Sequence, residues 1–261
     1  FLVFLIALPL CLGISLASGY PAVAGIFTAI IGGLVATFIS DAELTIKGPA
    51  AGLIVIALGC VQEFGFTGGV DPAKDYQAYR LALGVGVVAG VYQIILGLFR
   101  VGVLVNLFPK AAIHGLLASI GIIIISKQFP VLMGLNPQGS PLELLAGIPS
   151  FLINMNPKVG IIGIMGVIIV LGYGYIKNPK LKIIPAPMLM LLITVPMATF
   201  LAVGLEGSYT FNHQIYELGQ KFLVNVPVNL LNAVTFPDFS GITTETGIKY
   251  TVLFAIIGSL E

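Results

Sequence analysis

Charged residues are scarce in this sequence. Of its 261 residues only 9% are Asp, Glu, Lys or Arg, whereas 57% are hydrophobic and the mean hydropathy is +1.06. A soluble domain carries roughly 25% charged residues, so this chain lacks the polar surface that a water-soluble protein needs. The net charge of +1 also excludes a nucleic-acid partner, because neutralising phosphates requires clustered Lys and Arg. The composition predicts a polytopic membrane protein.

The sequence also lacks the residue patterns of common enzyme centres. No His, Cys or Asp cluster has the spacing of metal ligands, and neither a Gly-x-Ser-x-Gly motif nor a phosphate-binding loop is present. The two cysteines, Cys11 and Cys60, each lie inside an apolar run, which favours buried free thiols over a disulfide. We therefore expect no enzymatic activity, no cofactor and no metal site.

Long apolar runs recur along the chain. A helix that crosses a bilayer needs about 20 apolar residues, and seven runs approach this length. They are Phe1–Ser18, Ala22–Ile39, Leu81–Leu98, Ala111–Ile125, Gly160–Ile176, Met188–Val203 and Gly247–Glu261. Small residues recur over Gly84–Gly90, which permits close packing of the helix expected over Leu81–Leu98. Pro49–Val61 is apolar but too short to cross, and such broken segments indicate where a transporter binds its substrate.

The loop charges predict the orientation of these spans. Lys177, Lys180 and Lys182 lie in one short loop, and an excess of Lys and Arg marks cytoplasmic loops. The first span should therefore run from the cytoplasm outward. Two longer loops, Gln128–Lys158 and Gly204–Glu245, carry apolar residues at helical spacing, so we expect each to contain a helix that lies in the interface or caps the bundle.

The strongest candidate site surrounds Gly48-Pro49. Leu44–Ile46 is short and suits extended backbone, and Pro49 suits the first turn of a helix. The amides of Ala50, Ala51 and Gly52 would then point back along the helix axis. A helix N-terminus with small side chains is a ready binding site for an anion. The alternative is an ordinary broken helix with structural Gly and Pro.

Two charged residues, Lys47 and Glu261, are further candidates for function. Lys47 would either add a positive charge to the anion site or extend to the interface as an ordinary loop lysine. Glu261 lies about twelve residues beyond Lys249 in the last span, roughly 18 Å deeper at the rise of a helix. An acidic residue at that depth is a functional candidate that could bind a proton or a cation or pair with a basic group; alternatively, the helix simply ends there.

Four motifs, in the same order along the chain, resemble those of the SulP family of inorganic anion transporters, the sulfate permease-like proteins. Ile46–Leu53 is similar to the entry of the third helix of that family, and Ala89–Gly102 to the fourth helix. Pro185-Ala186-Pro187 and Gly258-Ser259-Leu260-Glu261 match segments before the seventh helix and within the eighth. The resemblance covers essentially the whole chain.

The resemblance implies an all-α polytopic membrane fold of fourteen segments in two inverted seven-helix repeats, divided into core and gate domains. Residues 1–261 would form a single transmembrane domain, with a first repeat over about 1–203, an extracellular loop over 204–245 and a truncated eighth helix over 246–261. A short extended segment would precede half-helix 3. Because the chain has no initiator Met, we expect the N-terminal part of a longer membrane domain, which in relatives is usually followed by a soluble STAS domain.

The same resemblance implies roles for individual residues. The residues expected to line the anion site are Thr45, Ile46, Lys47, Gly48, Pro49, Ala50 and Ala51. Leu8, Pro9 and Leu10 would face this site from the first helix. Glu261 falls on an acidic position that is linked to coupling by a proton or by sodium. Relatives commonly have Ser or another small residue where this chain has Lys47, and this difference bears on which anion is bound.

The predicted function is secondary active transport of a small inorganic anion (sulfate, bicarbonate or chloride) across the plasma membrane, coupled to Na⁺ or H⁺. The expected partners are the anion and the lipid bilayer, with a homodimer as the assembly. Two alternatives stay open at this point. One is a nucleobase–cation symporter of the same architecture, and the other is an anion channel.

Overall fold

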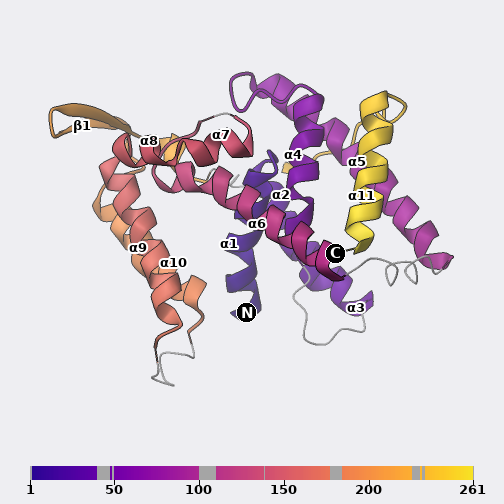
Figure 1. The fold of residues 1–261 in the computed structure, drawn as a ribbon, viewed down its shortest axis with the longest axis horizontal. Helices are drawn as coiled ribbons and strands as arrows, with labels where there is room; N and C mark the ends of the chain where they lie inside the picture. Colours follow the sequence, from indigo (N-terminus) through magenta and orange to yellow (C-terminus); the bar gives the residue numbers. More distant parts are fainter. Residues whose placement is uncertain are drawn as a thin grey trace. The chain divides into compact units, whose positions relative to one another are not determined.

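The fold is known from a computed structural model, which describes residues 2–39, 48, 50–99, 110–137, 139–176, 184–224, 230 and 233–260. Most of these residues are helical (Figure 1). The chain divides into two compact units, each described by itself below. Unit 1 consists of Phe1–Leu10 and Ile125–Val226, and unit 2 of Cys11–Ile124 and Pro227–Glu261. The expectation of a single transmembrane domain stays a prediction.

Each expected span coincides with helical structure. The helices are α1 (Leu2–Ala17), α2 (Ala22–Ile31) continued by η1 (Gly32–Ala36) and α3 (Thr37–Ile39), α5 (Pro72–Leu98), α6 (Lys110–Leu132), α9 (Pro157–Tyr173), α10 (Ala186–Phe200) and α11 (Glu245–Leu260). Among the described residues, α5 is the one helix whose length and composition alone suffice to cross a membrane. The other apolar helices comprise 10–17 described residues.

Helix α5 begins nine residues before the expected span, which started at Leu81. Its first turns are polar, so hydropathy did not detect them, but they are stabilised by a helix cap. The Asp71 carboxylate accepts hydrogen bonds from the amides of Ala73 (3.1 Å) and Lys74 (3.2 Å). Pro72 occupies the first helical position, where a missing N–H costs nothing. Hydropathy therefore located the apolar part of the helix but missed its capped beginning.

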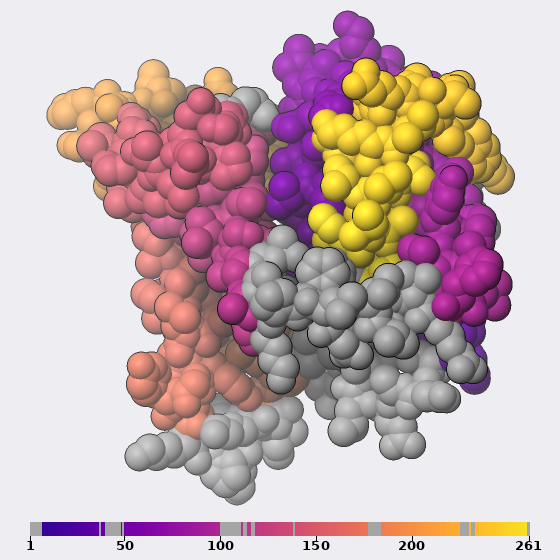
Figure 2. Space-filling model, turned by 45° about the vertical axis from the view of Figure 1, so that its right-hand side comes forward, coloured from indigo at the N-terminus to yellow at the C-terminus, as the bar shows by residue number. Residues whose placement is uncertain are grey.

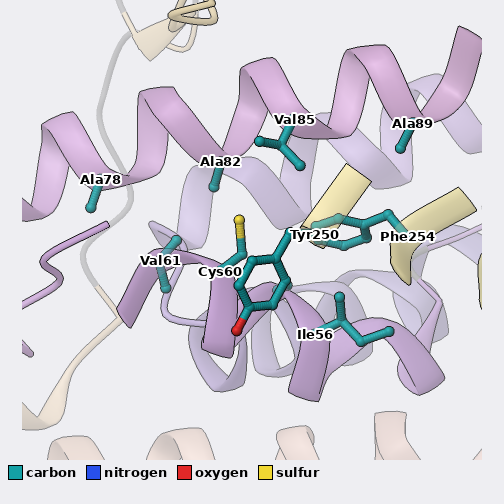
Figure 3. Packing of buried hydrophobic residues seen from close by; sticks show 10 residues of the cluster. Ile56, Cys60, Val61, Ala78, Ala82, Val85, Ala89, Tyr250 and Phe254 are labelled. Carbon is teal, nitrogen blue, oxygen red and sulfur yellow. The ribbon is translucent and has the colours of Figure 1, made fainter. Parts of the chain in front are cut away.

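The core of unit 2 lies where α5 meets α11 and α4 (Ile54–Glu63) (Figures 1 and 3). Helix α5 presents a row of small residues spaced by three or four positions, which places them on one face. They are Ala78, Ala82, Val85 and Ala89, all at most 3% exposed. Cys60 of α4 and Tyr250 and Phe254 of α11 pack against this row. Figure 2 shows α11, in yellow, lying directly against α5.

Both cysteines are buried free thiols, as expected. Cys60 belongs to the core of unit 2. Cys11 lies where α1 contacts α2. The two helices are so close there that a Cβ on Gly25 would overlap the backbone oxygen of Cys11. This close approach explains why a glycine occupies position 25.

The Gly84–Gly90 stretch allows close packing at its first glycine. A Cβ on Gly84 would overlap the backbone oxygen of Asp238, and the Asp238 amide donates to the Arg80 carbonyl at 2.9 Å. The segment before α11 therefore lies directly on α5. A Cβ on Gly86 or Gly90 would meet no atom within 4 Å, so packing does not require glycine at these two positions.

Unit 1 contains the helix pair α9 and α10, which lie side by side (Figure 1). The loop before α9 holds two short helices, α7 (Pro141–Ala146) and α8 (Ile148–Ile153), so its predicted helical character is confirmed. Ser140 begins α7 with a capping box, in which the Ser140 side chain accepts from the Glu143 amide and Glu143 accepts from the Ser140 amide. This reciprocal pair satisfies two backbone donors at the helix start.

The prediction of a second loop helix, around Leu218 and Phe222, was wrong. Residues 207–218 form a hairpin of β1 (Gly207–Phe211) and β2 (Gln214–Leu218), and a single 3-10 turn, Gln220–Phe222, follows. Asn212 and His213 adopt positive φ angles of 49° and 64°, which suit a two-residue hairpin turn. The described part of the chain is therefore mostly helical, consistent with the expected all-α membrane fold, with one small antiparallel hairpin in this loop.

Candidate functional site

The predicted anion site lies where extended backbone turns into helix. Ala50 is extended, with φ −76° and ψ 112°, and the 3-10 turn η2 (Ala51–Leu53) leads directly into α4. The first helical hydrogen bond runs from the Leu53 amide to the Ala50 carbonyl at 3.2 Å. The helix therefore begins at Ala51, two residues later than the Gly48-Pro49 sequence predicts, so the Ala50 amide is not part of the helical turn.

The structure describes only part of the predicted site. Gly48 and Ala50 are exposed and Ala51 is half-buried. On α1, Leu8 and Pro9 are partly buried, and Leu10 is 56% exposed. The predicted residues outside the described part of the chain are Thr45, Ile46, Lys47, Pro49 and Glu261. Their roles, and those of Leu8, Pro9 and Leu10, stay predictions.

Within unit 2 the start of α4 has neighbours from two other helices. A Cβ on Gly48 would lie 3.7 Å from the Cys11 sulfur of α1. One turn further on, Leu53 of η2 lies beside the last turn of α11, where its Cδ1 atom is 3.5 Å from the position of a Cβ on Gly258. The helix start carries the positive end of the α4 dipole, and it therefore has α1 next to Gly48 and α11 next to Leu53.

The far end of α4 is joined to α11 by polar side chains. Glu63, the last residue of α4, accepts hydrogen bonds from the Lys249 ammonium (2.5 Å) and the Tyr250 hydroxyl (2.9 Å). Tyr250 also covers Gly59, because a Cβ there would lie 2.7 Å from its hydroxyl. These contacts hold α4 against α11 by the end opposite to the predicted anion site.

Sequence reasoning assigned no role to Gln93, which the structure places next to this region. Its side-chain nitrogen donates to the Phe254 carbonyl of α11 at 3.2 Å. A signal was available, because Gln93 is the one side-chain amide in the apolar run Leu81–Leu98. A polar side chain at membrane depth is energetically costly unless it has a partner. Its presence in an apolar run therefore indicates a functional or structural role.

The whole chain, residues 1–261, matches the model of the sulfate permease family. This protein belongs to that family. The predicted resemblance is thereby confirmed, and the protein is a multi-pass membrane protein whose family consists of transporters rather than enzymes.

Two curated relatives show how much of a family member this chain represents. The bicarbonate transporter BicA of Picosynechococcus sp. is 28% identical over 196 residues, which are 75% of this chain and 33% of the relative. Sulfate transporter 2.2 of Arabidopsis thaliana is 28% identical over 202 residues, or 75% of this chain and 29% of the relative. The chain spans about a third of the length of these curated relatives.

A solved structure supports the fold. The transmembrane domain of a cyanobacterial bicarbonate transporter BicA superposes with a TM-score of 0.71 at 23% identity, covering 98% of this chain and 60% of that domain. The predicted membrane-transporter architecture is thus confirmed at the level of the overall helical fold.

Proposed function

We propose that the protein performs secondary active transport of a small inorganic anion (sulfate, bicarbonate or chloride) across the plasma membrane, coupled to Na⁺ or H⁺. The observation that carries the proposal is the start of α4, where extended Ala50 leads into a helical turn, with Gly48 near α1 and Leu53 near α11. A helix N-terminus binds anions through its amides and its dipole. The names of the relatives, transporters of bicarbonate and of sulfate, support this class of substrate.

In this proposal the anion binds at Thr45–Ala51, opposite Leu8, Pro9 and Leu10, and Glu261 supplies the coupling. An acidic residue at membrane depth is a functional candidate that can bind a proton or a cation. The complete protein would have fourteen segments in two inverted repeats and would work as a homodimer, with a core domain that moves against a gate domain. Alternating access through such a movement is common among transporters with repeats.

Uptake by the complete protein in proteoliposomes tests the function. We expect saturable uptake of labelled sulfate or bicarbonate that depends on a Na⁺ or proton gradient and is unaffected by excess uracil. Strong inhibition by uracil would instead support a nucleobase–cation symporter. Flux that neither saturates nor depends on a second ion would support an anion channel.

The coupling role is tested by Glu261→Gln, which keeps the shape of the side chain and removes its charge. We expect this variant to lose the dependence of uptake on the cation or proton gradient. The matched control is Glu245→Gln, in the first turn of α11, which should leave coupling intact. Coupled uptake by Glu261→Gln equal to that of the wild type would refute the role.

A further inference from the structure

Gln93 joins α5 to the last part of α11 inside an apolar environment. Its Nε2 atom donates to the Phe254 carbonyl at 3.2 Å, and the residues that precede it on the same face, Val85 and Ala89, belong to the buried core. Figure 3 shows Phe254 beside Ala89, one turn before Gln93. An apolar side chain of similar size could fill this space, but it could not bind the carbonyl. In low-polarity surroundings, such a bond between helices is retained because no water competes for it.

The Gln93 amide also occupies the space that a side chain on Gly258 would need. A Cβ on Gly258 would overlap Nε2 of Gln93 and would lie 3.5 Å from Cδ1 of Leu53. Gly258 is therefore the point where three elements meet: α5 through Gln93, η2 through Leu53, and the last turn of α11. Because Leu53 belongs to the first turn of the α4 segment, this junction places Gln93 and the last turn of α11 next to the start of α4.

Two polar connections hold α11, about one helical turn apart. Lys249 and Tyr250 donate to Glu63 of α4. Four residues after Tyr250, Phe254 accepts from Gln93 of α5. The Glu63 connection lies at the far end of α4, whereas the Gln93 amide lies next to Gly258 and so on the side of the α4 start.

We propose that Gln93 is a positioning residue of the anion site, which holds the last turn of α11 and the start of α4 in the spacing that binds the anion. This inference rests on the proposed function. Gln93 acts through Phe254, Gly258 and Leu53 and need not touch the anion itself. Its loss should therefore weaken anion binding more than it slows the transport cycle.

The test is a double-mutant cycle on the complete protein in proteoliposomes. Gly258→Ala forces the Gln93 amide aside, and Gln93→Ala removes it and leaves room for the new methyl group. We expect each single variant to raise KM for the transported anion roughly fivefold to tenfold, the effect of about one lost hydrogen bond, with kcat changed much less. In the Gln93→Ala background, Gly258→Ala should add nothing further, because interacting residues give non-additive effects.

Two further variants separate positioning from general packing. Gln93→Met keeps the length of the side chain without its donor and should raise KM as Gln93→Ala does. Gly90→Ala, one turn earlier on α5, meets no atom within 4 Å and should leave KM unchanged. The thermal midpoint of each purified variant shows whether it folds.

The outcomes distinguish this proposal from the proposed function. If the wild type shows no saturable anion uptake, the proposed function fails and this inference fails with it. If the wild type transports but the two substitutions have additive effects on KM, or if Gln93→Met lowers only the thermal midpoint, then Gln93 merely packs between helices and the inference alone is overturned.

Discussion

Helices α4, α5 and α11 of unit 2 are held together differently from helices α9 and α10 of unit 1. In unit 2 a row of small α5 side chains is almost completely buried against the other two helices. Helix α10, all of whose residues are described, has no buried residue, and α9 buries only Pro157, Gly160 and Gly166. One group of helices is packed around a core, whereas the other is a pair with exposed apolar faces.

Polar contacts connect the α9–α10 pair near both of its ends. The Lys158 ammonium, in the first turn of α9, donates to the Leu201 carbonyl just after α10, at 3.2 Å. At the other end, the Tyr173 hydroxyl donates to the Ile184 carbonyl, just before α10, at 2.7 Å. Between these contacts, branched side chains such as Val167 and Leu171 are 41% and 68% exposed. Apolar exposure of this kind is costly in water but not in lipid, where burial supplies no hydrophobic driving force between helices.

The comparison predicts that added volume harms unit 2 far more than unit 1. Ala82→Leu places three extra carbons at a position with no exposed surface, and overpacking costs up to about 3 kcal/mol of the free energy of unfolding. The smaller addition in Val167→Leu, one extra carbon at a 41% exposed position of α9, should cost less than about 0.5 kcal/mol. Thermal unfolding in detergent measures both. Equal effects would contradict the difference between the units.

Unit 1 should instead be sensitive to loss of a polar contact. Asn156, 5% exposed, accepts a hydrogen bond from the Tyr209 hydroxyl (2.7 Å) and donates to the Glu217 carbonyl (3.0 Å). Asn156→Ala removes both bonds and should cost about 2 kcal/mol, because it leaves buried groups without partners. Faster proteolysis within the hairpin should accompany this loss.

The control for this substitution is Asn154→Ala. Asn154 is exposed, and its side chain donates to the Ser150 carbonyl within the same short helix region, at 2.9 Å. Its loss should leave both the unfolding midpoint and the proteolysis rate close to those of the wild type. If the two variants behave alike, the hairpin is not anchored through Asn156.

The smallest predicted effect concerns pH and the segment that crosses α5. Hydrogen bonds from Ser240 and Gln77 lower the pKa of Asp238 from 3.8 to about 2. The Asp238 carboxylate therefore stabilises the fold at any pH above its ordinary pKa, and this contribution is lost as the pH falls toward 2. Unfolding midpoints of the wild type and of Asp238→Asn, measured across this acid range, should converge at its lower end. A constant gap between the two curves would show that the charge of Asp238 is unimportant.

Much of the helical framework could be predicted, because apolar runs and helix caps are local properties. Each predicted span coincides with helical structure, and the broken segment before α4 was located within two residues. The hairpin was missed because apolar residues such as Leu218 and Phe222 were interpreted by helical spacing, although Asn212-His213 between two β-prone runs is a turn signal. At the candidate site, sequence pointed to the helix start and, through the family resemblance, to the first and eighth helices beside it, but not to Gln93 of α5.

The sequence by itself determined that the chain lives in a membrane, where its spans lie and that a Gly-Pro break precedes α4. These follow from hydropathy and backbone preference, which act over a few neighbouring residues. Only the tertiary structure decided that Gln93 donates to the Phe254 carbonyl, 161 residues away. The absence of a side chain at Gly258 leaves room for the Gln93 amide. An amide in an apolar run shows that a partner is needed, but which distant carbonyl it reaches depends on how α5 and α11 pack.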